Sequence, residues 1–125
     1  MSALDGISED QPALARADLI SRLAAATGFD WDDPEGARAK VIEEMAEVDA
    51  ADGLHERADE IGDLLFAVVN WARKLGIDPE AALQQATSKF ERRFRAMEAD
   101  AGPAFPTLPI DQMEALWQAV KRRNG

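Results

Sequence analysis

Apolar residues recur at helical spacing along most of the chain, and no stretch alternates in the way a β-strand would. The pattern predicts helices over about residues 12–27, 34–53, 54–75, 79–99 and 110–122. Gly53 and Gly76 suit helix ends, while Pro34 and Pro79 suit first helical turns. We therefore expect an all-α fold, with four main helices and a shorter C-terminal helix packed as a bundle.

The same spacing predicts which side chains form the core. On the second and third helices the expected core residues are Val41, Ile42, Met45, Val48, Ile61, Leu64, Leu65, Val68, Val69, Ala72 and Leu75. On the fourth and fifth they are Leu83, Ala86, Phe90, Phe94, Met97, Met113, Leu116, Trp117 and Val120. The proline-rich stretch 102–109 is expected to be non-helical. Residues 1–10 are expected to form a flexible tail, and residues 11–123 a single domain.

The overall charge restricts the classes of partner. The 125 residues carry a formal net charge of −10 at pH 7, which argues against nucleic acid or an anionic membrane as a general partner. A phosphorylated substrate is still compatible, because a bound metal ion reverses the sign of the local charge. The chain has no cysteine, which excludes a thiol nucleophile or a zinc–thiolate site. The first residues lack the basic and apolar segments of a secretory signal, so we expect a soluble, cytoplasmic protein.

Acidic residues occupy matching positions on the second and third helices. Glu44 and Glu47 are three residues apart, as are Glu60 and Asp63, so each pair projects from one face of its helix. If the two helices form an antiparallel hairpin that turns at Gly53, Glu44 lies level with Asp63, and Glu47 lies level with Glu60. The pattern therefore predicts that four carboxylates converge.

Such a cluster needs a counter-charge. Two like charges about 5 Å apart repel by about 3 kcal/mol at an effective dielectric constant near 20, and we expect no neighbouring cation to cancel this repulsion. Carboxylate oxygens are the ligands that Mg²⁺ or Mn²⁺ prefers, so we interpret the cluster as a metal site. The alternative is a solvated acidic helix face. The apolar stripe of the third helix argues against that alternative, because it places the acids at the edge of a packed seam.

Other side chains could contact a phosphorylated substrate. Lys89 and Arg93 are one helical turn apart and could bind phosphate oxygens, or they could be surface bases that balance nearby glutamates. Asn70 lies two turns beyond Asp63 on the same face and could bind a sugar or a base. Trp31 could stack on a base, although packing explains it equally well. The single histidine, His55, lies in the predicted turn, so a Ser-His-acid triad is not expected.

These motifs together resemble one known family, the MazG nucleoside triphosphate pyrophosphohydrolases of the all-α NTP pyrophosphatase superfamily. The resemblance covers about residues 14–123 and is closest to the C-terminal of the two copies that many members carry. Its motifs are Glu43-Glu44-x-x-Glu47 with Glu60-x-x-Asp63, Gly28-Phe29-Asp30-Trp31, Asn70-x-Ala72-Arg73-x-Leu75-Gly76, Lys89-Phe90-Glu91-Arg92-Arg93-Phe94 and Trp117-x-x-x-Lys121. It implies Mg²⁺-dependent attack of water on the α-phosphorus of a nucleoside triphosphate, which yields the monophosphate and pyrophosphate.

The resemblance also implies roles for single residues. Glu44, Glu47, Glu60 and Asp63 would be metal ligands, and Glu43 would support a ligand or orient the attacking water. Trp117 and Lys121 would join Lys89, Arg93, Asn70 and Trp31 as substrate contacts. A homodimer or a dimer of dimers is expected. Two alternatives stay open: a related enzyme that acts on a deoxynucleotide or on phosphoribosyl-ATP, and a catalytically silent helical dimer that binds metal or a protein partner.

Overall fold

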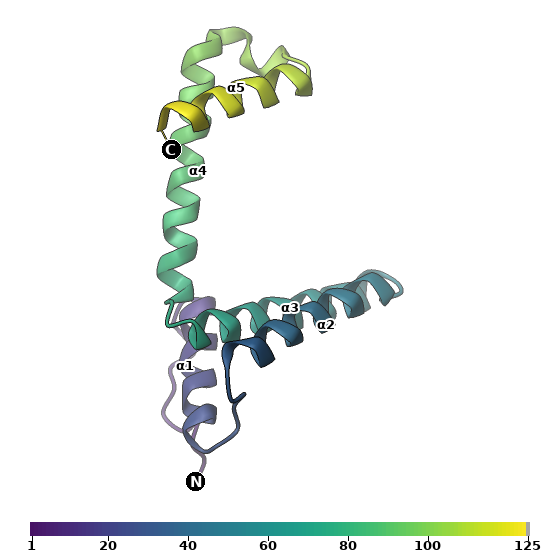
Figure 1. Ribbon diagram of the computed structural model, residues 1–125, viewed down its shortest axis with the longest axis vertical. Coiled ribbons are helices and arrows are strands. Elements are labelled where there is room, and N and C mark those ends of the chain that lie inside the picture. Colours follow the sequence, from purple (N-terminus) through teal and green to yellow (C-terminus); the bar gives the residue numbers. More distant parts are fainter. Residues whose placement is uncertain (125) are drawn as a thin grey trace. The chain divides into compact units, whose positions relative to one another are not determined.

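The computed structural model describes residues 1–124, and these residues form helices and connecting loops without a strand. The helices are α1 (Ala13–Ala26), α2 (Pro34–Ala50), α3 (Leu54–Lys74), α4 (Pro79–Ala101), the 3₁₀ helix η1 (Gly102–Thr107) and α5 (Ile110–Asn124) (Figure 1). The all-α class is confirmed, and the helices lie close to their predicted ranges. The chain divides into two compact units, Met1–Ala82 and the part from Leu83 onward, which we describe separately.

Two helices begin at the aspartate–proline pairs. A carboxylate oxygen of Asp33 accepts a hydrogen bond from the Gly36 amide at 3.1 Å, and Pro34 occupies the first turn of α2. Asp78 caps α4 in the same way, with its Oδ1 accepting from the Glu80 amide at 3.0 Å. Each carboxylate binds an amide that has no partner within its own helix, and the proline lacks such an amide altogether.

Helices α2 and α3 form the predicted hairpin, and they lie side by side in Figure 1. The turn passes through Gly53, whose φ of 85° is in the left-handed region that favours glycine. Ala37, Val41, Ala67 and Val69 are buried in this unit, and α1 packs against α3 as well. The small side chains of the alanines suit helices that pack closely together.

Much of the predicted apolar stripe is exposed instead of buried. On α2, Ile42 and Met45 are 51% and 53% exposed, although both were expected in the core. On α3, Ile61, Leu65, Val68 and Leu75 are also exposed, whereas Val69 is buried and Leu64 and Ala72 are partly buried. The physical reason is that two helices cover only one side of each other, so a wide apolar face keeps a side without a partner in a single chain.

The second unit has its own small core. Met97 of α4, Phe105 of η1 and Val120 of α5 are buried together, with Met113, Leu116 and Trp117 packed against them. Leu83, Ala86, Phe90 and Phe94 were expected in the core, but they are exposed in this single chain. The stretch 102–109 was expected to be non-helical, but residues Gly102–Thr107 form a 3₁₀ helix. Its short turns need no regular i→i+4 hydrogen bonds, so they tolerate Pro103 and Pro106.

Among residues 1–124, no helix combines the length and the low polarity that crossing a lipid bilayer requires.

Candidate active site

Three of the predicted carboxylates meet in the hairpin. Glu44 of α2 and Glu60 and Asp63 of α3 each offer one oxygen, and these three oxygens lie within 4.8 Å of one another. Glu44 is buried, Glu60 is partly buried and Asp63 is exposed. A group that runs from buried to exposed can hold an ion on one side and leave the other side open to a substrate. This geometry is compatible with the carboxylate-rich shell of a divalent cation.

The electrostatics of Glu60 reflect this crowding. Its pKa is raised above the ordinary value, first because desolvation disfavours the charged form and then because the neighbouring acids repel it. The acids that contribute are Asp63, Glu44, Glu47 and Asp59. The repulsion from each of these acids is a smaller part of the shift than desolvation, and a bound cation would relieve it.

A lysine that sequence reasoning missed lies beside this group. Lys40 Nζ is 3.2 Å from Glu44 Oε1 and 3.3 Å from Glu43 Oε1, and both glutamates raise the lysine pKa, Glu44 more strongly. The expectation that no nearby cation offsets the repulsion was therefore wrong. The signal was present in the sequence, because Lys40 precedes Glu43 by three residues and Glu44 by four, which are the spacings of helical ion pairs.

The two remaining acidic candidates take different positions. Glu47 is exposed and is not part of the three-oxygen group, although its charge contributes to the raised pKa of Glu60. Glu43 is exposed and accepts a hydrogen bond from Lys40. The assignment of Glu47 as a metal ligand and of Glu43 as a supporting or water-orienting group stays a prediction.

An ion-pair network fixes the loop between α1 and α2 to the end of α3. The Arg73 guanidinium donates to both carboxylate oxygens of Asp30, at 2.7 and 3.1 Å. Lys74 Nζ donates to Asp30 at 3.2 Å and to the Trp31 carbonyl at 2.8 Å. The pKa of Asp30 is held well below its ordinary value, mainly by the hydrogen bond from Arg73. This network, which we call the Asp30 clamp, holds the backbone of Trp31 through the hydrogen bond from Lys74.

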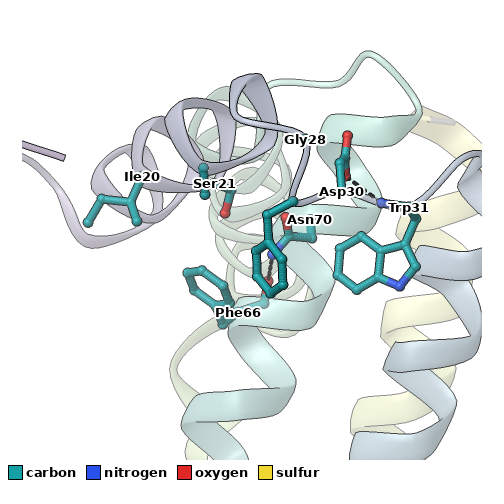
Figure 2. A pocket seen from close by; sticks show the side chains of 9 residues that line it. Ile20, Ser21, Gly28, Asp30, Trp31, Phe66 and Asn70 are labelled. Atoms are coloured by element: carbon teal, nitrogen blue, oxygen red, sulfur yellow. Dashed lines mark hydrogen bonds between the residues drawn. The ribbon is translucent and has the colours of Figure 1, made fainter. Parts of the chain in front are cut away.

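The loop and the two helices around it enclose a pocket of about 370 Å³. Its apolar lining includes Ile20 from α1, Phe29 and Trp31 from the loop, and Phe66 from α3. Its polar lining includes Ser21 and Asn70, both only 5% exposed. Figure 2 shows Phe66 and Trp31 on either side of Asn70 in this view. Two residues predicted as substrate contacts, Trp31 and Asn70, therefore line one cavity.

The other predicted substrate contacts belong to the second unit. Lys89 is exposed on α4, and Lys121 is exposed on α5. Arg93 is only 8% exposed, and its guanidinium lies 5.5 Å from the centre of the Trp117 ring, which is a cation–π geometry. The ring of Trp117 also contacts Phe90, with the ring centres 5.5 Å apart. Their roles as substrate contacts stay predictions.

Comparison with known proteins gives a consistent result. The profile of the MazG nucleotide pyrophosphohydrolase domain matches residues 33–97. A nucleoside triphosphate pyrophosphohydrolase/pyrophosphatase MazG from Thermotoga maritima is 43% identical over 113 residues, which cover 88% of this chain and 44% of that protein. A nucleoside triphosphate pyrophosphohydrolase from Escherichia coli K12 is 45% identical over 131 residues, which cover 98% of this chain and 50% of that protein.

The chain thus spans about half the length of the curated relatives it matches. The matched range contains all three carboxylates of the hairpin group and extends to Met97 in α4. Because the profile covers more than half of the chain and the identity to the relatives exceeds 40%, the chain belongs to the MazG nucleotide pyrophosphohydrolase family.

Proposed function

We propose that this chain is a nucleoside triphosphate pyrophosphohydrolase that depends on Mg²⁺, with Mn²⁺ as a possible substitute. The observation that carries the proposal is the group of Glu44, Glu60 and Asp63, whose oxygens lie within 4.8 Å of one another. Membership of the MazG family and the printed names of the two relatives support the reaction class. In this proposal the protein is cytoplasmic and acts on the nucleotide pool.

The proposed reaction needs few protein groups. Water adds to the α-phosphorus, the bond between this phosphorus and the pyrophosphate oxygen breaks, and the products are the nucleoside monophosphate and pyrophosphate. A divalent cation held by the carboxylates would neutralise phosphate charge and lower the pKa of a coordinated water. Glu44, Glu60 and Asp63 would hold this ion, and Glu47 is proposed as a further ligand. Glu43 is proposed to orient the attacking water.

Basic residues are proposed to bind the phosphates. Lys40 is next to the carboxylates, and its ammonium could move from Glu44 to a phosphate oxygen once a cation neutralises the acids. Lys89, Arg93 and Lys121 are proposed as further phosphate contacts, with Trp117 beside Arg93. All of these proposed roles are phosphate binding, and none of these residues is proposed to transfer a proton or to attack the phosphorus.

We further propose that the chain works as a homodimer or as a dimer of dimers. The supporting observation is the exposed apolar face of α3, where Ile61, Leu65 and Val68 follow one another at helical spacing and are each at least 42% exposed. A contiguous apolar face of this kind is typical of an association surface. A second copy would bury it.

The decisive experiment measures products from a panel of ribonucleoside and deoxyribonucleoside triphosphates and phosphoribosyl-ATP, with Mg²⁺ and with EDTA. In ¹⁸O-labelled water, attack at the α-phosphorus places the label in the monophosphate, whereas attack at the β-phosphorus places it in pyrophosphate. We expect label in the monophosphate and no reaction in EDTA. No hydrolysis of any substrate by the folded protein would overturn the proposal and favour a catalytically silent dimer.

A matched pair of variants assigns the reaction to the carboxylates. We expect Asp63→Asn to abolish hydrolysis while the circular dichroism spectrum stays unchanged. Asp49→Asn removes one carboxylate from an exposed position of α2 outside the group, so it should keep wild-type turnover. Full activity of Asp63→Asn, or equal losses in both variants, would refute the assignment.

A further inference from the structure

Lys40 is placed where it would compete with a divalent cation for one carboxylate of the hairpin group. Its Nζ lies 3.2 Å from Oε1 of Glu44 and 3.3 Å from Oε1 of Glu43. Glu44 is the most buried of the three grouped acids, since its side chain is only 10% exposed, whereas Glu60 is partly buried and Asp63 is exposed. The ammonium of Lys40 therefore neutralises the carboxylate that has the least access to water.

Helix stability is a weak explanation for this ion pair. Lys40 and Glu44 both belong to α2 and lie one turn apart. The lysine precedes the glutamate, which is the less favourable order for a helical ion pair of this spacing. The lysine side chain is also 40% exposed, and ion pairs that are open to water contribute little to stability. What distinguishes this pair is that its acceptor belongs to the group of three carboxylates.

One carboxylate does not serve two cations equally well. The two oxygens of Glu44 can contact an ammonium and a divalent cation at the same time, but the two positive charges then repel each other across one small group. Because Lys40 Nζ lies 3.2 Å from the carboxylate, it is well inside the screening length of about 8 Å at physiological salt. Lys40 therefore either weakens the binding of a divalent cation or leaves Glu44.

The side chain of Lys40 is free to change its partner. A lysine carries its charge on a flexible four-carbon stem, and this one is partly open to water. Glu43, whose side chain is 59% exposed, offers a second carboxylate beside the first. An ammonium that leaves Glu44 thus stays next to the group, where it can bind a phosphate oxygen. Binding of metal and binding of phosphate would then depend on each other.

We propose that Lys40 regulates metal binding at the hairpin carboxylates: it opposes a divalent cation at Glu44, and its displaced ammonium binds the phosphates of the substrate. The proposal rests on the function proposed above and deepens the role of Lys40 in it. Removal of Lys40 should therefore tighten metal binding and weaken triphosphate binding. A lysine that only oriented Glu44 as a ligand would have a different effect, because its removal would weaken metal binding.

Mn²⁺ binding to the nucleotide-free chain tests the competition directly. Lys40→Met keeps an unbranched side chain and removes the charge. We expect it to bind Mn²⁺ about fivefold more tightly than wild type, measured by the loss of the free electron paramagnetic resonance signal. Lys40→Arg keeps the charge and should bind Mn²⁺ as wild type does. Arg38→Met removes the same charge from an exposed position of α2 that faces away from Lys40, so it should change the affinity by less than about twofold.

Thermal unfolding separates this regulation from a structural role. In EDTA, Lys40→Met should melt at a lower temperature than wild type, because Glu44 loses its counter-charge. With saturating Mn²⁺ the difference should vanish or reverse, since the variant binds the ion more tightly. An ion pair that only supported the fold would cost the same stability in both conditions, and that result would overturn the proposal. The comparison stays decisive if Lys40→Met is less stable than wild type.

The regulatory role and the hydrolytic function can fail separately. If Lys40→Met binds Mn²⁺ as wild type does, or more weakly, while wild type hydrolyses triphosphates with Mg²⁺, the regulatory role is overturned and the function stands. If Lys40→Met binds Mn²⁺ more tightly but no triphosphate is hydrolysed, the proposed function fails and the competition at Glu44 survives. In an active enzyme, a higher KM for triphosphates in Lys40→Met would support the exchange to phosphate, and an unchanged KM would overturn it.

Discussion

Removal of the charge at the centre of the Asp30 clamp should destabilise the chain measurably. Asp30→Asn keeps the shape of the side chain, but only one of the two contacts with Arg73, at 2.7 and 3.1 Å, keeps an acceptor oxygen, and that contact loses its charge. The side chains of Asp30, Arg73 and Lys74 are 20%, 12% and 17% exposed, so water screens them only partly. Exposed ion pairs contribute up to about 1 kcal/mol and broken buried pairs cost about 3–5 kcal/mol, so we expect a loss of about 2 kcal/mol.

The pH dependence of this loss follows from the direction of the pKa shift. The pKa of Asp30 in the folded chain is well below the ordinary value of an aspartate, because the hydrogen bond from Arg73 favours the carboxylate. A carboxyl group with a depressed pKa contributes stability that is fully present above the unfolded pKa and is lost as the pH falls through the folded pKa. The gap between wild type and Asp30→Asn should therefore be constant from pH 5 upward and shrink below about pH 4.

Urea denaturation followed by circular dichroism at pH 7 and at pH 3 measures this gap. Asp32→Asn serves as the control, because Asp32 is exposed in the same loop and should have an effect near zero. A double-mutant cycle with Arg73→Gln should give a coupling of about 1 kcal/mol or more. A gap below about 0.5 kcal/mol at pH 7, or a gap of equal size at pH 3, would refute the account of the clamp.

Three other predictions concern the acids, the surface and the bases. In EDTA, Asp63→Asn should raise the melting temperature by several degrees because it relieves repulsion by Glu44 and Glu60; an unchanged or lower melting temperature would contradict the crowding. Leu65→Glu, at a position that is 55% exposed, should shift sedimentation from dimer to monomer, and a wild type that is already monomeric at micromolar concentration would refute the dimer. Lys89→Gln should raise KM for triphosphates several-fold with little change in kcat, and an unchanged KM would exclude Lys89 as a phosphate contact.

Local rules predicted a large part of the fold. The helix starts at Pro34 and Pro79 and the turn at Gly53 depend on backbone chemistry within a few residues, and the structure has all three. The meeting of Glu44 with Glu60 and Asp63 also follows from local information, because two helices joined by a tight turn must run antiparallel. The distances of these residues from the turn along the chain were sufficient to predict that they meet.

Two kinds of feature could not be predicted from the sequence. The first is contacts between residues far apart in the chain, and the second is how much of an apolar helix face other helices cover. Arg73 and Asp30 are 43 residues apart, and no periodicity links a loop residue to the end of a later helix. The exposure of Ile42 and Leu65 depends on how many helices cover the hairpin, which an apolar pattern does not specify. The ion pairs of Lys40 are different, because its spacing of three and four residues from Glu43 and Glu44 is visible in the sequence. A prediction based only on the acidic residues does not include this lysine.

The central claim is that Glu44, Glu60 and Asp63 together hold a divalent cation, and direct titration tests it without any reaction. Mn²⁺ is titrated into the nucleotide-free chain, and binding is followed by the loss of its free electron paramagnetic resonance signal. We predict that wild type and Asp49→Asn bind the ion equally and that Asp63→Asn binds it at least tenfold more weakly. Equal binding by all three proteins, or no binding by wild type, would contradict the account.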